Sequence, residues 1–187
     1  MLNYWIDGIR HITDLEGYDH MLFLTALCAP FTFRDWRPVL LLATAFTIGH
    51  SISLALAALD ILRFSSSLIE FCIPLTISGT SLYHLRKQSK EVTIFSYVSA
   101  ALFGVIHGMG FSSFFRMIAG EDAGFIGQLF LFNVGVECGQ LLILTAVLGI
   151  IAILTSALPS LKNRMTYFIA GPALLVSIVL AIEKWPF

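Results

Sequence analysis

The sequence predicts an all-α protein, a polytopic bundle of transmembrane helices, and composition and apolar run length indicate this class. Of the 187 residues, 57% are hydrophobic and only 12% are charged, with a mean hydropathy of +0.86. Soluble domains carry about 25% charged residues, so this chain is suited to a less polar surrounding than water. Several apolar runs reach the roughly 20 residues that cross a bilayer. They are too long and too evenly apolar for barrel strands, in which polarity alternates.

The apolar runs predict about six spans within one membrane domain that covers residues 1–187. The first is short, and the second begins at Pro38, which suits the first turn of a helix. Serines precede the third span and can cap it, while Trp185 follows the sixth and suits the membrane interface. Residues 2–14 are expected to form a short amphipathic helix that lies at the interface. The expected spans are approximately 18–33, 38–59, 66–85, 92–118, 124–157 and 165–182.

Lys and Arg predict the orientation of the chain, because cytoplasmic loops are enriched in both. With the N-terminus outside, the inner loops hold seven of these residues: Arg34, Arg37, Arg86, Lys87, Lys90, Lys162 and Arg164. The outer side holds four: Arg10, Arg63, Arg116 and Lys184. We therefore expect both termini outside. The net charge of −1 provides no basic surface for nucleic acid, so the lipid bilayer is the expected partner, with a homo-oligomer left open.

Polar and ionisable side chains interrupt the spans at a shared depth. Such residues are rare inside membranes and usually mark a site or a pathway. With the N-terminus outside, all of them fall between the outer surface and the midplane. The candidate metal-handling residues among them are Asp19, His20, His50, Glu70, His107, Asn133 and Glu137.

Helical spacing places the polar residues of the fifth span on one face. At about 100° per residue, Asn133, Glu137 and Gln140 form one narrow stripe. Gly135 and Gly139 lie on the opposite side, where a neighbouring helix can approach closely. Glycines also flank a histidine of the fourth span, where they allow close helix contact or a local break in the helix: Gly104, Gly108 and Gly110 around His107.

Imidazoles and carboxylates in one dry layer suit a first-row transition ion. Imidazole binds nickel, cobalt, zinc and copper, and carboxylate or amide oxygen can complete the shell. We expect nitrogen ligands from His20, His50 and His107. Oxygen ligands, or partners that orient an imidazole, are expected from Asp19, Glu70, Asn133 and Glu137. The lack of a thiolate or Met cluster disfavours Cu(I), and calcium or magnesium would favour more oxygen.

Simpler roles compete for several of these residues. An intramembrane histidine can serve as a helix–helix hydrogen bond worth about 1 kcal/mol. Glu137 can be a neutral carboxyl paired with an imidazole, and Glu70 lies near a span end where it can be solvated. His84 lies close to Arg86 and Lys87 in the sequence. These basic neighbours indicate that His84 is a solvated residue of an inner loop. If the site is real, Glu137 should lie within reach of at least one of His50 and His107.

Five stretches together resemble the HupE/UreJ family of bacterial membrane proteins. They follow the family's order and cover about residues 8–141: HITDLEGYDHMLFL (11–24), FTIGHSISLALAAL (46–59), IE (69–70), FGVIHGMGF (103–111) and FNVGVECGQL (132–141). The resemblance implies a small inner-membrane permease for nickel or cobalt that supplies hydrogenase or urease. It also implies that the metal-handling positions are His11, Asp19, His20, His50, His107 and Glu137.

Three functions from different classes fit these features. The favoured one is a secondary transporter of a divalent transition-metal ion, nickel or cobalt, with zinc also open. The runner-up is an intramembrane zinc hydrolase, with His20, His50 and His107 as ligands and Glu137 as general base, although H-E-x-x-H is absent. The third is a haem or quinone protein with His50 and His107 as axial ligands. We expect a transporter rather than an enzyme, and no P-loop indicates ATP coupling in this chain.

Overall fold

The computed structural model describes every residue except 1, 16, 63, 120–123 and 187. The described residues form helices and no strand, which confirms the predicted all-α class. The helices are α1 (Leu2–Thr13), α2 (Asp19–Cys28), α3 (Trp36–Ala58), α4 (Ser66–Lys87), α5 (Ile94–Ala119), α6 (Phe125–Ala157) and α7 (Met165–Glu183), with short 3₁₀ turns at Phe33–Asp35 and Pro159–Leu161.

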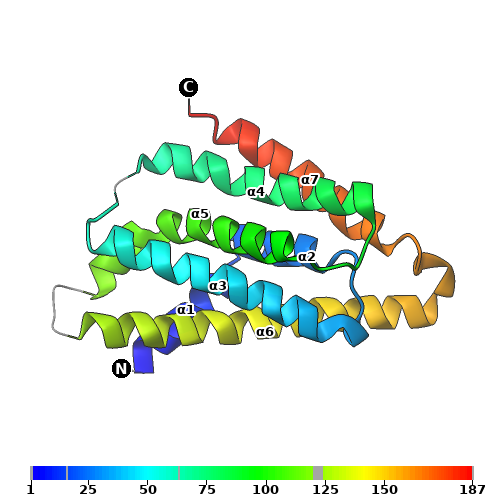
Figure 1. Cartoon of the computed structure of the whole chain (residues 1–187), viewed down its shortest axis with the longest axis horizontal. Coiled ribbons are helices and arrows are strands. Elements are labelled where there is room, and N and C mark those ends of the chain that lie inside the picture. The colour runs from blue at the N-terminus through cyan, green and yellow to red at the C-terminus, as the bar shows by residue number, and fades with distance from the viewer. Residues whose placement is uncertain (1, 16, 63, 120–123, 187) are drawn as a thin grey trace.

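The long helices run roughly along a common axis (Figure 1). Among the described residues, four segments are long and apolar enough to cross a membrane: Phe33–Ala57, Ile94–Ser112, Phe125–Ala157 and Met165–Glu183. Large apolar side chains such as Ile48, Leu142 and Ile182 are exposed on the outside of the bundle. Contact with lipid accounts for this exposure, because such broad apolar faces are unusual on a protein surrounded by water.

The first predicted span differs from the structure. Helix α2 has only 10 residues, and at 1.5 Å per residue it covers about 15 Å of a hydrocarbon core that is about 30 Å thick. Figure 1 shows that α1 precedes α2 along the same direction through the bundle. Together α1 and α2 form one broken crossing, in which α1 ends at Thr13 and α2 begins at Asp19.

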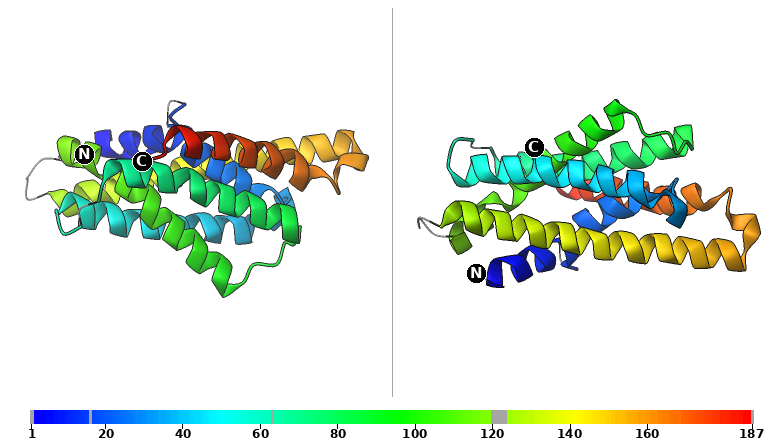
Figure 2. Two further views of the ribbon diagram at one scale, coloured as in Figure 1. Left: turned by 90° about the horizontal axis from the view of Figure 1, so that it is seen from above. Right: turned by 60° about the horizontal axis from the view of Figure 1, so that its bottom comes forward.

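The short helix expected at residues 2–14 is present as α1 (Leu2–Thr13), and it packs against another helix. Helix α1 packs along α6, as Figure 2 shows. A Cβ atom on Gly8 would collide with the backbone of Phe132, and one on Gly135 would collide with the carbonyl of Trp5. Ile12 is fully buried. One face of α1 therefore contacts α6.

Helices α3 and α5 form another close pair, because their glycines allow the two backbones to touch. Gly49 faces the carbonyl of Ala101, and Gly104 faces the carbonyl of Phe46. Helix α5 continues unbroken past His107, so its glycines provide close contact and not a helix break. Figure 2 also shows α7 running beside α4.

The connections divide between two ends of the bundle. Both termini lie toward one end, while the connections α2–α3, α4–α5 and α6–α7 lie toward the other (Figure 1). Lys90, on the α4–α5 connection, forms an ion pair with Asp35 on the α2–α3 connection. At the end without the termini, an ion pair therefore joins the α2–α3 and α4–α5 connections.

Candidate metal centre

Four histidines from four helices converge inside the bundle. His11 comes from α1, His20 from α2, His50 from α3 and His107 from α5. One ligand atom each from His11, His20 and His50 lies within 4.8 Å of the others, and the same holds for Asp19, His20 and His107. His20 belongs to both groups. The ring centroids of His11 and His20 are 4.7 Å apart, and those of His20 and His107 are 4.9 Å apart.

Nitrogen atoms of this cluster have no partner within the described protein. His50 is completely buried, and neither of its ring nitrogens is hydrogen-bonded. Nε2 of His11, Nε2 of His20 and Nδ1 of His107 are also buried without a partner. Buried polar atoms are costly to leave unpaired. A cation bound to either group of ligand atoms would satisfy the lone pairs of that group.

The break between α1 and α2 places three of the ligand candidates. His11 lies in the last turn of α1, while Asp19 and His20 open α2. Gly17 lies in the intervening segment, whose residues connect two short helices instead of continuing one. Discontinuous helices are a recurrent way to form an ion site within a membrane bundle.

Asp19 orients His20 through a direct contact. Oδ1 of Asp19 lies 2.9 Å from Nδ1 of His20, and the same oxygen accepts the backbone N–H of His20 at 2.8 Å. A carboxylate that accepts the Nδ1 proton leaves Nε2 of the ring unprotonated and available to a metal. Asp19 therefore acts as an orienting partner of His20. Its carboxylate oxygen also belongs to the second group of ligand atoms.

A threonine orients His107 in a similar way. The Thr76 hydroxyl donates to the carbonyl of Ile73 at 2.7 Å and lies 3.0 Å from Nε2 of His107. Because a hydroxyl has a single proton, Thr76 accepts the Nε2 proton of His107 in this arrangement. The lone pair of His107 then lies on Nδ1, the nitrogen that has no partner in the protein. Thr76 was not among the residues singled out in the sequence.

Phenylalanine rings enclose the histidines. The ring of His11 lies 3.7 Å from that of Phe111, and the ring of Phe46 lies 5.1 Å from that of His107. Phe23 stacks on Phe46 at 4.8 Å and is completely buried. This apolar surround excludes bulk water, so an ion at the cluster would exchange most of its hydration shell for protein ligands.

Glu70 does not join either group of ligand atoms. Its carboxylate accepts a hydrogen bond of 2.9 Å from Lys184 at the end of α7, and both side chains are half exposed. This hydrogen bond raises the pKa of the Lys184 ammonium group. Glu70 and Lys184 line a cavity of about 270 Å³ that Asp19 also lines. Glu70 therefore lies at an opening that leads toward the cluster.

The polar stripe of α6 contacts α3 at residues that precede His50 in the chain. Thr44 donates to Oε1 of Glu137 at 2.6 Å, and Thr47 donates to Oε1 of Gln140 at 2.9 Å. Glu137 belongs to neither group of ligand atoms, and no hydrogen bond to a histidine is found for it in the described chain. The side-chain amide of Asn133 donates to the carbonyl of Leu129 in its own helix. Sequence spacing identified the stripe but not its threonine partners.

The expected exposure of His84 is wrong. His84 lies within α4 and is only 7% exposed, with its ring 6.3 Å from that of Phe31. The adjacent basic residues suggested a loop, but α4 extends to Lys87 and turns His84 inward. The spacing Thr76, Thr80, His84 on one helical face was the signal that could have revealed this burial.

Comparison with known families gives a match over nearly the whole chain. A family model described as HupE / UreJ protein matches residues 1–185. The chain belongs to the HupE/UreJ family. Membership implies a role of the metal-transporter type. The match includes α7 and the end of α6, which the five resemblant stretches did not reach. No curated protein and no solved structure matched.

The donor set of this HupE/UreJ protein fits a borderline transition ion. Neutral imidazole nitrogens with one nearby carboxylate suit nickel, cobalt or zinc, and they do not resemble the all-oxygen shell of calcium or magnesium. The same geometry weakens the zinc hydrolase alternative, because the carboxylate of Glu137 is held by Thr44 instead of facing the histidine groups.

Proposed function

We propose that this protein is a secondary transporter that carries a divalent transition-metal ion, nickel or cobalt, across the bacterial inner membrane. The observation that supports this most is the set of buried imidazole nitrogens without protein partners on four helices. In this proposal the ion enters past Glu70 and Asp19 and binds His20 together with His11, His50 and His107. Zinc is a further candidate, since imidazole binds it as well.

Each residue has a separate task in this proposal. Glu70 exchanges its partner Lys184 for the cation at the outer opening, and Asp19 holds His20 in the tautomer that binds metal. Thr76 does the same for His107. Glu137 and Gln140 keep α6 in register with α3 through Thr44 and Thr47, on the side of the cluster away from the termini. Because protons compete with metal for imidazole and carboxylate, metal binding should weaken as the pH falls.

The proposal is tested by metal uptake into liposomes that contain the purified full-length protein. Wild-type protein should take up Ni²⁺ or Co²⁺, measured with a metal-sensitive dye trapped inside, and the triple variant His20→Ala, His50→Ala, His107→Ala should not. Ser177→Ala is a matched control, because it removes a buried hydrogen bond to Ser78 of 2.8 Å between α4 and α7.

Equilibrium dialysis of both variants against Ni²⁺, Co²⁺ and Zn²⁺ would show which ion the cluster binds and whether the Ser177 control retains it. Uptake of all three ions by the triple variant at the wild-type rate would refute the proposed transport function.

A further inference from the structure

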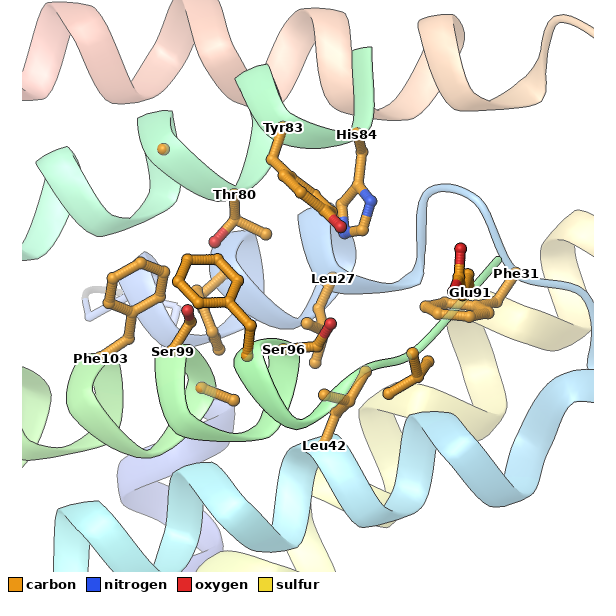
Figure 3. Close-up of a pocket in the computed structure, with 15 residues that line it drawn as sticks. Leu27, Phe31, Leu42, Thr80, Tyr83, His84, Glu91, Ser96, Ser99 and Phe103 are labelled. Atoms are coloured by element: carbon orange, nitrogen blue, oxygen red, sulfur yellow. The ribbon is translucent and has the colours of Figure 1, made fainter. Parts of the chain in front are cut away.

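A second cavity lies on the other side of the histidine cluster from the opening at Glu70. It has a volume of about 280 Å³ and lies between α4 and α5, with α2 behind it and α3 below α5 (Figure 3). Thr80, Tyr83 and His84 of α4 line one side, and Ser96 and Ser99 of α5 line the other. A cavity of this size has room for several water molecules, so it can hold an ion with part of its hydration shell.

Helix α4 connects this cavity with the rest of the proposed route. Glu70 lines the opening at one end, Thr76 contacts His107, and Thr80 and His84 line the second cavity. At 1.5 Å per residue, Thr76 lies about 9 Å beyond Glu70 along the helix, and His84 lies about 12 Å beyond Thr76. The three landmarks occur in order along one helix.

A single aromatic layer separates the cavity from the cluster. Phe23 lines the cavity, and its ring lies 5.5 Å from that of His107 and 6.2 Å from that of Phe103, which also lines it. A change in the position of the Phe23 ring would therefore join the cluster to the cavity. Such apolar constrictions are a common form of gate in membrane transport proteins.

His84 provides a ligand in a cavity that is otherwise largely apolar. His84 is buried, with only 7% of its surface exposed, and its Nδ1 has no hydrogen-bond partner in the described protein. Figure 3 shows the imidazole extending from α4 toward the space that Ser96 and Leu27 border. Glu91 lines the same cavity from the α4–α5 connection.

We infer that this cavity is the release chamber of the transport route, in which His84 accepts the divalent transition-metal ion from the cluster and passes it toward Glu91. The inference rests on the proposed transport function and adds a second binding position to it. The ion moves from imidazole nitrogen to imidazole nitrogen and then to a carboxylate near the basic loops. No bond other than metal coordination forms or breaks.

The first test fills the cavity. Gly79 lines it, and a Cβ atom placed there meets no atom within 4 Å, so Gly79→Trp has room to fold. Gly149 on α6 is equally open but lines neither of the two cavities, so Gly149→Trp is the matched control. Ni²⁺ uptake into liposomes should fall about tenfold in the first variant, as for a blocked pore, and remain normal in the control.

The second test removes the ligand. His84→Ala should lower Ni²⁺ uptake by about tenfold, as the loss of one metal-handling imidazole does. Equilibrium binding of Ni²⁺ at the cluster in detergent should be unchanged. Ser81→Ala is the control, because Ser81 is fully buried on the same helix but does not line the cavity.

Three results separate this inference from the proposed function. Normal uptake in both Gly79→Trp and His84→Ala, with uptake abolished in His50→Ala, would overturn the release chamber and leave the transport function standing. Loss of Ni²⁺ binding at the cluster in His84→Ala would also overturn it, since His84 would then support the fold of the cluster. Wild-type Ni²⁺ uptake no faster than in liposomes without protein would overturn the transport function itself.

Discussion

His20 is the residue on which both groups of ligand atoms depend. It lies at the start of α2, beside the break in the first crossing, and its Nε2 has no partner in the described protein. Its Nδ1 is held by Asp19 at 2.9 Å. The direction in which Nε2 of His20 points is therefore set by the carboxylate of the preceding residue. The sequence indicates this neighbour, but it does not give the orientation of the carboxylate.

Asp19→Asn should weaken metal binding by about 10- to 100-fold, because the amide no longer holds His20 in one tautomer. Equilibrium dialysis with Ni²⁺ on the purified protein measures this change. Asp35→Asn is a suitable control, since Asp35 binds Lys90 and Thr32 at the far end of the bundle. Equal affinities for Asp19→Asn and wild type would show that Asp19 does not orient the site.

Thr76→Val should weaken Ni²⁺ binding several-fold, because it removes the acceptor of the His107 Nε2 proton while keeping the side-chain shape. Thr76→Ser retains the hydroxyl and should restore the affinity. Isothermal titration calorimetry of the two variants measures the difference. A serine variant as weak as the valine variant would indicate that shape, and not the hydroxyl, matters at this position.

At the scale of elements, the broken crossing formed by α1 and α2 is the feature that assembles the site. Helix α1 places His11 at its end because it lies directly on α6, with Gly8 and Gly139 at the contact. Helix α2 then begins at the depth of the cluster. A continuous helix would carry His11 and His20 nine residues apart, on opposite faces at about 100° per residue.

Gly104→Ala should separate α3 from α5, because its Cβ would collide with the carbonyl of Phe46. We expect a loss of about 1–3 kcal/mol in stability, measured by thermal unfolding in detergent, and weaker Ni²⁺ binding, since His50 and His107 lie on these two helices. Gly171→Ala on α7 is the control, because a Cβ atom there meets no atom within 4 Å. A Gly104 variant as stable as this control would contradict the close approach.

At the scale of the whole molecule, the basic connections and the second cavity lie toward the same end of the bundle. The basic connections Arg34–Arg37, Arg86–Lys90 and Lys162–Arg164 lie at the end opposite the termini, where the second cavity also lies. Of the four basic residues expected on the other side, Arg63 and the Arg116 side chain fall outside the described residues. The proposed orientation places the termini outside and the release chamber toward the cytoplasm.

Fusions to the C-terminus test this orientation in cells. A C-terminal alkaline phosphatase should be active, because that enzyme needs an oxidising compartment for its disulfides, and a C-terminal green fluorescent protein should be dark. The same reporters inserted after Lys162 should give the opposite pattern. A fluorescent C-terminal fusion would reverse the proposed direction of the route.

Much of the fold could be predicted because it depends on local pattern. Apolar run length predicted the helices corresponding to α3 through α7 within a few residues, and the glycine spacing of α6 predicted a close neighbour. Three histidines of the cluster, His20, His50 and His107, were also identifiable, since polar residues in apolar runs face the bundle interior. His11 was indicated only by the family resemblance. The neighbour itself was not identifiable, because α1 and α6 are separated by more than a hundred residues.

By itself, the sequence determined the helical membrane class and indicated that His20, His50 and His107 face the bundle interior, because the cost of burying polar groups in lipid restricts where they can point. Only the tertiary structure decided that residues 2–28 form one broken crossing, that Glu70 pairs with Lys184, and that Glu137 binds Thr44. The tertiary structure also decided that the His84 side chain lines a cavity. These features arise from contacts between helices distant in the chain, which helical periodicity within a single segment does not encode.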